Sequence, residues 1–207
     1  MSFICPFPAG APVTATYQGK VPSVLNGTFT LPISGQTLIV LSIQWQTAAV
    51  SGFGVTIGGH VSTIVVGGPL TSGNNAVLAA AFVSASDPNT WSVAGTTPFS
   101  SRAETYIYQI DGVSSINATG AVSGVPGDPG TISIPANCAV IASGNISSGG
   151  STTCSVTGLI QDSTDAVSQH SYASGHDNFL VANPSQPVAV NGTNITALIS
   201  CYAIFQA

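Results

Sequence analysis

The most chemically capable side chains of this sequence gather between residues 161 and 178. This stretch holds two of the three histidines and three of the seven acidic residues of the chain. Imidazole and carboxylate groups are ligands that Zn²⁺ and Mn²⁺ favour. Their spacing matches neither a His-Glu-x-x-His motif nor a calcium loop with ligands at alternate positions. We therefore predict a solvated polar loop at one end of the fold, with a loop that contacts a host or glycan as the alternative, and no metal. The loop residues are Asp162, Asp165, His170, Tyr172, His176 and Asp177.

Catalysis finds little support in the residue pattern. Ser171, His176 and Asp165 can be combined into a nucleophilic triad, but a chain this rich in serine always offers some such combination. No Gly-x-Ser-x-Gly turn is present to expose a nucleophile. Glu104 is the one glutamate, and its neighbour Arg102 suggests a structural ion pair. We expect neither an enzyme nor a cofactor.

The two tryptophans could provide a surface on which sugars stack. Trp45 shares its face with Ile39, Leu41 and Ile43, which favours core packing. Trp91 follows an Asp-Pro-Asn-Thr segment at the start of an expected strand. It is the better candidate of the two for an exposed aromatic, although core packing remains the favoured interpretation.

Four cysteines, Cys5, Cys138, Cys154 and Cys201, show no Cys-x-x-Cys spacing of a metal site. Cys138 and Cys201 lie in apolar segments, where a free thiol behaves as a small hydrophobic side chain. We expect mostly reduced, buried thiols. If there is a disulfide, the leading pair is Cys138 with Cys154, which flank a turn.

Charge is scarce throughout the chain. Only 4% of the residues are charged and the net charge is −5, whereas a soluble domain usually carries about 25%. Two isolated cations cannot neutralise a phosphate backbone or bind an anionic membrane. No apolar run approaches the roughly 20 residues of a membrane span, and the N-terminus lacks the basic and apolar regions of a signal peptide. A neutral surface can pack against copies of itself, which favours assembly over catalysis.

The N-terminal segment differs from the rest of the chain. Residues 1–22 contain four prolines, which fix φ and remove amide donors, and this favours an extended arm. Its apolar residues either complete an edge strand of the same domain or dock on a neighbouring subunit; they are Phe3, Ile4, Phe7, Val13 and Tyr17. Residues 23–207 form the main domain, with a subdivision near 124–130 as an option.

Short apolar segments separated by glycine, proline and asparagine clusters follow the arm. Thr37–Trp45 alternates with a period of two, and Gly58-Gly59 between two β-rich runs predicts a tight hairpin. Thr196–Phe205 is apolar on both faces and is expected to be covered on both sides. No segment combines a helical stripe with caps. The predicted fold class is all-β: an antiparallel β-sandwich of jelly-roll type with an extended Pro-rich N-terminal arm.

The order of these segments resembles the β-sandwich structural proteins of bacteriophage virions. The likeness rests on the apolar strand at 37–45, the Gly-Gly hairpin at 55–66, the strand Tyr106–Val113 that ends in Asp-Gly-Val, and the apolar strands at 138–144 and 197–205. It implies a capsid decoration, head-fibre or tail-surface protein that binds the particle or a host glycan and performs no chemistry.

We therefore expect a virion protein whose partners are its own copies or other virion proteins, with a host-surface glycan as a further contact, and with no nucleic acid and no membrane insertion. One alternative is a secreted or cell-surface filament subunit assembled by strand addition. Another is a carbohydrate-binding module that uses Trp91 or the polar loop.

Overall fold

The protein is built from strands arranged in four sheets. The computed structural model describes residues 12–22, 26–29, 35–47, 50, 52–67, 73–95, 103–124, 127, 129–148, 153–167 and 169–207. Every helix or strand element in these ranges is a β-strand, and all strand pairs are antiparallel. The predicted antiparallel β-sandwich is thereby confirmed.

Two sheets come from the first part of the chain. Inner sheet 1 consists, in spatial order, of β1 (Thr14–Val21), β9 (Ala103–Asp111), β3 (Gln36–Thr47), β7 (Gly73–Ser84) and β6 (Thr63–Gly67). Outer sheet 1 consists of β2 (Asn26–Thr28), β8 (Thr90–Ala94), β4 (Gly54–Ile57) and β5 (His60–Val61).

The other two sheets come from the second part. Inner sheet 2 consists of β10 (Ala118–Ser123), β17 (Ile195–Gln206), β12 (Cys138–Ser148), β15 (His170–Phe179) and β14 (Ile160–Val167). Outer sheet 2 consists of β11 (Pro129–Ile134), β16 (Asn183–Gly192) and β13 (Cys154–Thr157).

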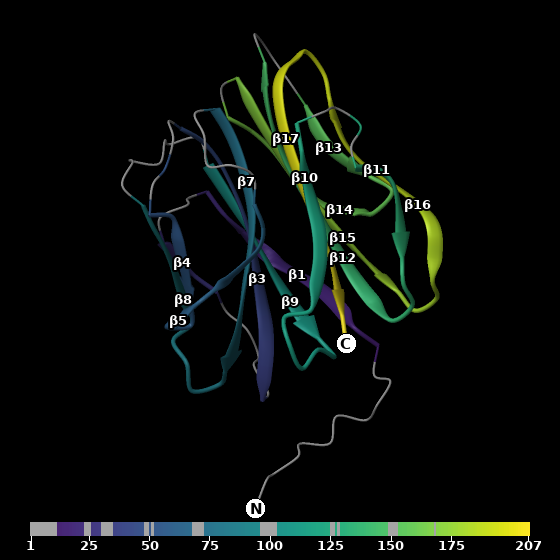
Figure 1. Cartoon of the computed structure of the whole chain (residues 1–207). Coiled ribbons are helices and arrows are strands. Elements are labelled where there is room, and N and C mark those ends of the chain that lie inside the picture. Colours follow the sequence, from purple (N-terminus) through teal and green to yellow (C-terminus); the bar gives the residue numbers. More distant parts are fainter. Residues whose placement is uncertain are drawn as a thin grey trace, which may run out of the picture.

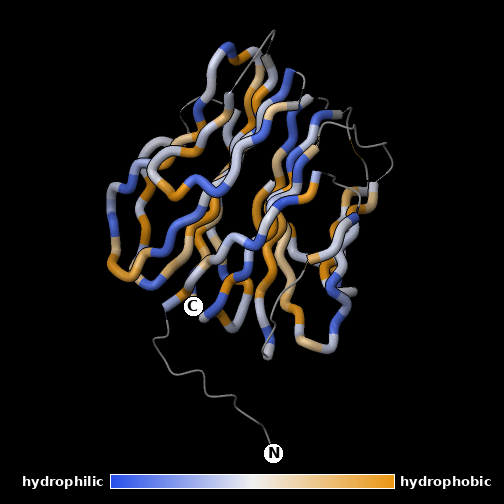
Figure 2. Tube along the Cα trace, turned by 180° about the vertical axis from the view of Figure 1, so that it is seen from behind, coloured by the Kyte–Doolittle hydropathy of each residue, from blue (hydrophilic) through white to orange (hydrophobic). Residues whose placement is uncertain are grey.

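The four sheets stack as layers, from β4 and β8 at one side of the molecule to β11 and β16 at the other (Figure 1). Side chains on successive positions of a strand point to opposite faces. In β3, Ile39 and Trp45 join the core under outer sheet 1, whereas Leu38 and Val40 join the core between the two inner sheets. A third core lies between inner sheet 2 and outer sheet 2. Both inner sheets are therefore covered on both faces, and hydrophobic residues run along their strands (Figure 2).

The strand order of the first part repeats in the second. Across the inner sheets, β1, β9, β3, β7 and β6 correspond in order to β10, β17, β12, β15 and β14. Across the outer sheets, β2, β8 and β4 correspond to β11, β16 and β13. A one-residue bulge interrupts β6 between Ile64 and Val66, and an equivalent bulge interrupts β14 between Gln161 and Ser163. We call residues 12–111 the first half and 118–207 the second half.

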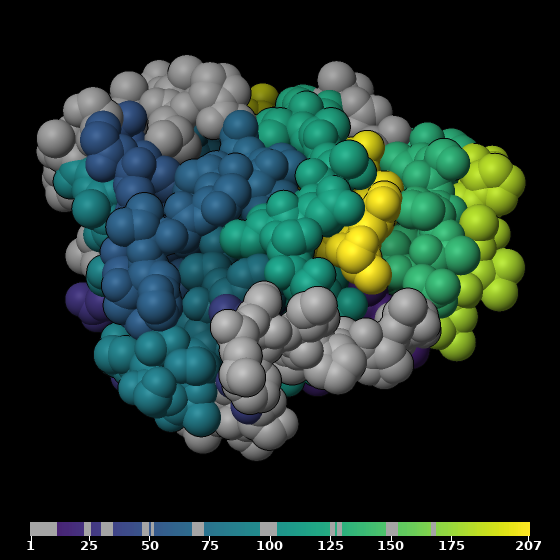
Figure 3. Space-filling model, turned by 60° about the horizontal axis from the view of Figure 1, so that its bottom comes forward, coloured from purple at the N-terminus to yellow at the C-terminus, as the bar shows by residue number. Residues whose placement is uncertain are grey.

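The halves pack through equivalent positions. Ser42 of β3 and Ser143 of β12 occupy the same place in their sheets, and their hydroxyl oxygens are 2.8 Å apart across the central core. Contact between equivalent residues is what a two-fold arrangement produces. The first half, in blue and teal, and the second half, in green and yellow, lie side by side (Figure 3).

These boundaries change the expected domain organisation. In terms of strand order the division falls at residues 112–117, whereas 124–130 begins after β10 and includes the first two residues of β11, inside the second half. Residues 14–21 form β1, which pairs with β9 at the edge of inner sheet 1, so this part of the predicted arm is an edge strand of its own domain. Residues 1–11 lie outside the described residues.

Two local predictions are confirmed. Gly58 and Gly59 form the turn between β4 and β5 with φ of 61° and 81°, the left-handed values that such a turn requires. β17 lies between β10 and β12, so the segment that is apolar on both faces is central in its sheet.

Candidate functional site

The predicted contact loop is a β-hairpin. Asp162 and Asp165 lie in β14, and His170, Tyr172, His176 and Asp177 lie in β15, which pairs with β14 along its length. The prediction of a solvated loop is therefore wrong for these residues. The hairpin packs between inner sheet 1 and outer sheet 2, so that Asp162, His170 and Tyr172 are largely buried, whereas Gln161 and Thr164 are exposed.

Alternation along β15 decides which side chains meet. Tyr172 belongs to the central core, whereas its neighbour Ala173 belongs to the core under outer sheet 2. Ser171 and His176 therefore lie on opposite faces, and the triad drawn from the sequence does not assemble. The Ser171 hydroxyl instead donates to the carbonyl oxygen of Asp165 at 2.7 Å and accepts from the backbone N–H of Cys154 at 2.9 Å.

A largely buried acid–imidazole pair lies toward the end of the hairpin that is opposite its turn. His176 Nδ1 is 2.8 Å from both carboxylate oxygens of Asp162, whose side chain is only 5% exposed. The Tyr108 hydroxyl of β9 donates to Asp162 at 2.8 Å and lies 2.6 Å from Ser174 Oγ. Asp162 is the extra residue of the bulge in β14. Burial, followed by the charge of Asp162, raises the pKa of Tyr108, so its hydroxyl stays a donor.

A second ionic group lies further along the same junction. Lys20 of β1 forms an ion pair with Asp165 of β14. Glu104 of β9 is 3% exposed, and its Oε2 has no hydrogen-bond partner among the described residues. The pKa of Glu104 is raised to about 7, first by burial and then by the charge of Asp165, while the charge of Lys20 opposes the shift.

Together these side chains form a polar seam between the halves. We use this name for Tyr17, Lys20, Glu104, Tyr106, Tyr108, Asp162, Asp165, Ser174 and His176. β1 and β9 belong to the first half, and β14 and β15 to the second. Chemically the seam can hold and transfer protons among carboxyl, imidazole and phenol groups.

The equivalent junction at the other side of the two-fold arrangement is apolar. Following the ladders outward from Ser42 and Ser143, Lys20 corresponds to Val122 and Glu104 to Ile199. The remaining seam positions for which an equivalent can be read correspond to Gly120, Cys201, Ala203, Val65, Leu78 and Ala80. A Cβ at Gly120 would lie 2.4 Å from Val66, so this junction is closely packed.

The six loop residues do not converge on one point. The described residues contain no group of three or more histidine, cysteine, aspartate or glutamate side chains arranged to hold a metal. His170 Nδ1 lies 3.0 Å from Ser147 Oγ at the far end of β15, and the Asp177 carboxylate accepts from the N–H of Asn178. Asp162 and Asp165 are engaged by different partners.

The described residues of the predicted N-terminal arm pack against their own domain. Val13 is 1% exposed in the central core, and the Tyr17 ring packs 5.6 Å from that of Tyr108. Docking on a neighbouring subunit is therefore the wrong interpretation for these two side chains. Phe3, Ile4 and Phe7 lie outside the described residues.

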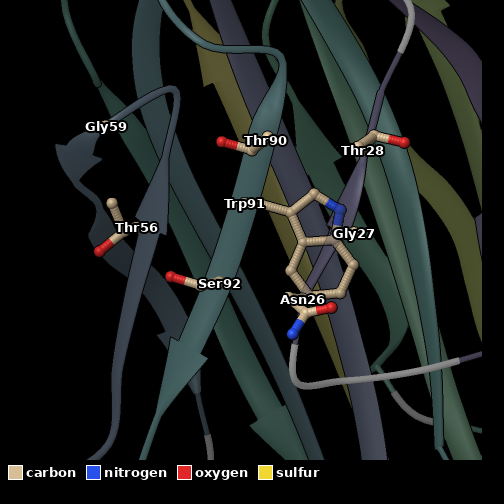
Figure 4. Close-up of a pocket in the computed structure, with 8 residues that line it drawn as sticks. All are labelled: Asn26, Gly27, Thr28, Thr56, Gly59, Thr90, Trp91 and Ser92. Carbon is tan, nitrogen blue, oxygen red and sulfur yellow. The ribbon is translucent and has the colours of Figure 1, made fainter.

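Trp91 is buried, which confirms the favoured core interpretation and shows that its candidacy as an exposed aromatic is wrong. It is 2% exposed, and its indole lies over Gly27 of the neighbouring strand β2 (Figure 4). A pocket of about 400 Å³ adjoins it. The pocket is lined by Asn26, Gly27, Thr28, Thr56, Gly59, Thr90, Trp91 and Ser92. Trp45 is fully buried, as predicted.

The described cysteines are thiols. Cys138, Cys154 and Cys201 are free and buried, so the predicted reduced state is confirmed for them and the pairing of Cys138 with Cys154 is wrong. Burial raises their pKa values to about 11, 12 and 12 respectively, which leaves them unreactive at neutral pH. Cys5 lies outside the described residues.

Sequence reasoning overlooked the β9 side of the seam. Glu104, Tyr106 and Tyr108 alternate along one strand, and this polar face within an apolar segment was the available signal. Glu104 points into the seam, while its expected partner Arg102 lies outside the described residues.

Comparison with known proteins does not assign the chain to a family. The chain has no significant match to any family model, curated protein or solved structure. Within the described ranges there is no helix with the length and hydropathy needed to cross a membrane.

Proposed function

We propose that this protein is a structural component of a tailed-phage virion, such as a capsid decoration, head-fibre or tail-surface protein, and that it acts by protein–protein assembly. One observation carries the proposal. None of the seven described strands of the two outer sheets contains a lysine, arginine, aspartate or glutamate. The described strands of both outer sheets therefore carry no carboxylate, ammonium or guanidinium group.

These faces are nevertheless polar. Outer sheet 1 presents Asn26, Thr28, Thr90 and Ser92, and outer sheet 2 presents Thr131, Ser133 and Thr157. Hydroxyl and amide groups can exchange hydrogen bonds with a partner, whereas an unpaired charge buried at an interface costs several kcal/mol. Such faces can be covered by other protein subunits at little electrostatic cost.

The strand order supports the same proposal. We take each half to be a jelly roll, in which β5 and β6 are one strand that crosses from the outer to the inner sheet. Jelly rolls are common in viral capsid and lectin domains. The fold alone does not determine function, and the charge-free outer faces are the stronger support.

The filament alternative meets an obstacle at one sheet edge. β13 is an edge strand, but the N–H groups of Cys154 and Val156 are taken by Ser171 Oγ and by Gln161 Oε1, the latter at 3.0 Å. Side chains that occupy edge donors discourage the addition of a strand. We do not extend the proposal to a glycan ligand, because Trp91 and most of the predicted contact loop are turned inward.

Light scattering of the purified chain at low and high salt tests the proposal, together with co-sedimentation with capsids that lack it. We expect self-association or particle binding with little salt dependence. Ser92→Lys on outer sheet 1 and Ser133→Lys on outer sheet 2 place an ion on each face, and at least one should reduce association tenfold or more. Ser92→Thr is the neutral control. A chain that stays monomeric and ignores particles would contradict the proposal.

A further inference from the structure

Lys20 and Asp165 form an ion pair that joins the two halves. Lys20 lies on β1 and pairs in register with Tyr106 of β9, and Asp165 lies on β14 opposite Tyr172 of β15. The two side chains are 36% and 25% exposed, so they sit at the mouth of the polar seam. An amine and a carboxyl group are thus held in contact although they are 145 residues apart in sequence.

Glu104 faces this pair from a third strand. In the β1–β9 ladder Lys20 lies opposite Tyr106, so Glu104 is its diagonal neighbour on the same face. Glu104 is 3% exposed, and its Oε2 has no hydrogen-bond partner among the described residues. The Tyr106 hydroxyl is likewise buried without a hydrogen-bond partner in the described part of the chain.

We propose that Lys20 and Asp165 become joined by a side-chain amide bond that the folded protein forms by itself. Transfer of one proton within the ion pair leaves a neutral amine and a carboxylic acid. The Nζ lone pair attacks Cγ of Asp165 and forms the C–N bond. Glu104 accepts a proton from Nζ and donates it to the departing oxygen; the C–O bond breaks and one water molecule leaves. No oxidant, reductant or other reactant is required.

The seam supplies what this condensation needs. Holding the reacting groups in contact removes the entropic cost of bringing them together. The pKa of Glu104 lies at about 7, so near neutral pH it can both accept and donate a proton. The Tyr106 hydroxyl, whose pKa is raised by burial, remains a donor for the oxyanion that develops on Asp165. Asp165 also lines a pocket of about 180 Å³, which gives the released water an exit.

The apolar junction shows that the fold does not require these groups. Its equivalents of Lys20 and Glu104 are Val122 and Ile199, and the halves pack there without ions. Of the two equivalent junctions between the halves, only the polar seam combines an amine (Lys20), a carboxyl group (Asp165) and a buried acid (Glu104). The inference concerns the chain itself and does not depend on the proposed virion role.

The sequence offers a direct test, because Lys20 and Arg102 are its only lysine and arginine. Trypsin under denaturing conditions should cut an unlinked chain into residues 1–20, 21–102 and 103–207. If the amide forms, Lys20 no longer presents a free amine and trypsin does not cut after it. The pieces on either side of Arg102 then remain covalently joined. The intact chain should also be lighter than its sequence by one water molecule.

Three variants separate the chemistry from the structure. Lys20→Arg keeps the ion pair with Asp165 but has no primary amine, and should yield three separate pieces and the full mass. Glu104→Gln keeps the pair and removes the proton carrier, and should slow closure at least tenfold. Glu104→Asp should restore part of the rate. Mass spectra of newly translated chain, recorded over time from acidic to basic pH, should show closure fastest near neutral pH.

The result that overturns the inference is also clear. If folded wild-type chain, incubated at neutral pH, keeps its full mass and releases residues 1–20 with trypsin, then no amide forms. If the wild type is linked and Glu104→Gln closes at the same rate with the same pH profile, the assignment of Glu104 is wrong. Self-association is not measured, so either outcome leaves the proposed virion role untouched.

Discussion

At the scale of single residues, the environment decides what an ordinary side chain does. Glu104 is the only glutamate of the chain, and in water it would be an unremarkable surface acid. On the inward face of β9 its carboxyl group loses hydration and lies near the negative charge of Asp165, and both effects raise its pKa. Only the positive charge of Lys20 acts in the opposite direction. Its pKa rises from 4.5 to about 7. The folded protein therefore favours the neutral form of Glu104 up to about pH 7.

This shift predicts how stability depends on pH. Between pH 4.5 and 7 the folded state holds a proton that the unfolded state has released, so the free energy of unfolding falls as pH rises through this range. Glu104→Gln should remove up to about 3 kcal/mol of this loss. Urea denaturation at several pH values measures the effect. It should be made in chains that carry Lys20→Arg, which keep the positive charge and cannot form the amide.

Asp111 provides a matched control for this experiment. It lies on the same strand, is exposed, and accepts hydrogen bonds from Gln109. Asp111→Asn should leave the pH profile unchanged. A Glu104→Gln chain whose stability falls between pH 4.5 and 7 as steeply as that of its parent would show that Glu104 is not the group responsible.

At the scale of elements, prediction succeeded where one periodicity dominated. The face of Ile39, Leu41, Ile43 and Trp45 is buried as its period of two indicated, and the Gly58-Gly59 turn has the required left-handed backbone. β14 and β15 were missed because their alternation is not one of hydrophobic against polar side chains. One face of β15 carries Ser174 and His176 into the polar seam. Its other face carries small residues such as Ser171 and Gly175.

Close packing within outer sheet 1 gives a prediction at this scale. A Cβ at Gly27 would lie 2.8 Å from three ring atoms of Trp91, so the buried indole would have to shift to accommodate it. Gly27→Ala should destabilise the protein by roughly 1–3 kcal/mol. Thermal and urea unfolding followed by tryptophan fluorescence measure the change.

Gly54 is the matched control on the neighbouring part of the same sheet. A Cβ there meets nothing within 4 Å, and its backbone is not left-handed. Gly54→Ala should change stability by no more than about 0.5 kcal/mol. Equal effects of the two substitutions would mean that the contact with Trp91 does not limit position 27.

At the scale of the whole molecule, the repeated strand order could not be predicted from the sequence. Equivalent positions carry unlike residues, such as Tyr17 and Gly120 or Glu104 and Ile199, so no repeat of residue types remains. What persists is geometric: the strand order, the bulge in β6 and β14, and the serines that meet at the centre. The polar seam could not be predicted, because it joins strands of both halves.

The central core predicts that the halves unfold together. It takes side chains from both inner sheets, so separating the halves would expose it. Val188→Ala, in the outermost core of the second half, should lower stability by roughly 1–3 kcal/mol. The fluorescence transition should shift by the same amount, although Trp45 and Trp91 both lie in the first half.

The exposed Val61 serves as the control, since Val61→Ala removes a side chain that is 88% exposed and should leave the transition unchanged. Far-ultraviolet circular dichroism follows strands of both halves. If Val188→Ala shifts the dichroism and not the fluorescence, the halves unfold independently.

The two-fold arrangement has a consequence for how this chain could connect other subunits. Outer sheets 1 and 2 close the stack at opposite ends and face away from each other. Under the proposed assembly function, each outer sheet would contact a neighbouring subunit, and a single chain would act as a bivalent spacer. With sheets about 10 Å apart, the four layers would hold two such neighbours at a fixed separation of at least roughly 30 Å. Rigidity of that kind suits a lattice whose members must keep a constant interval.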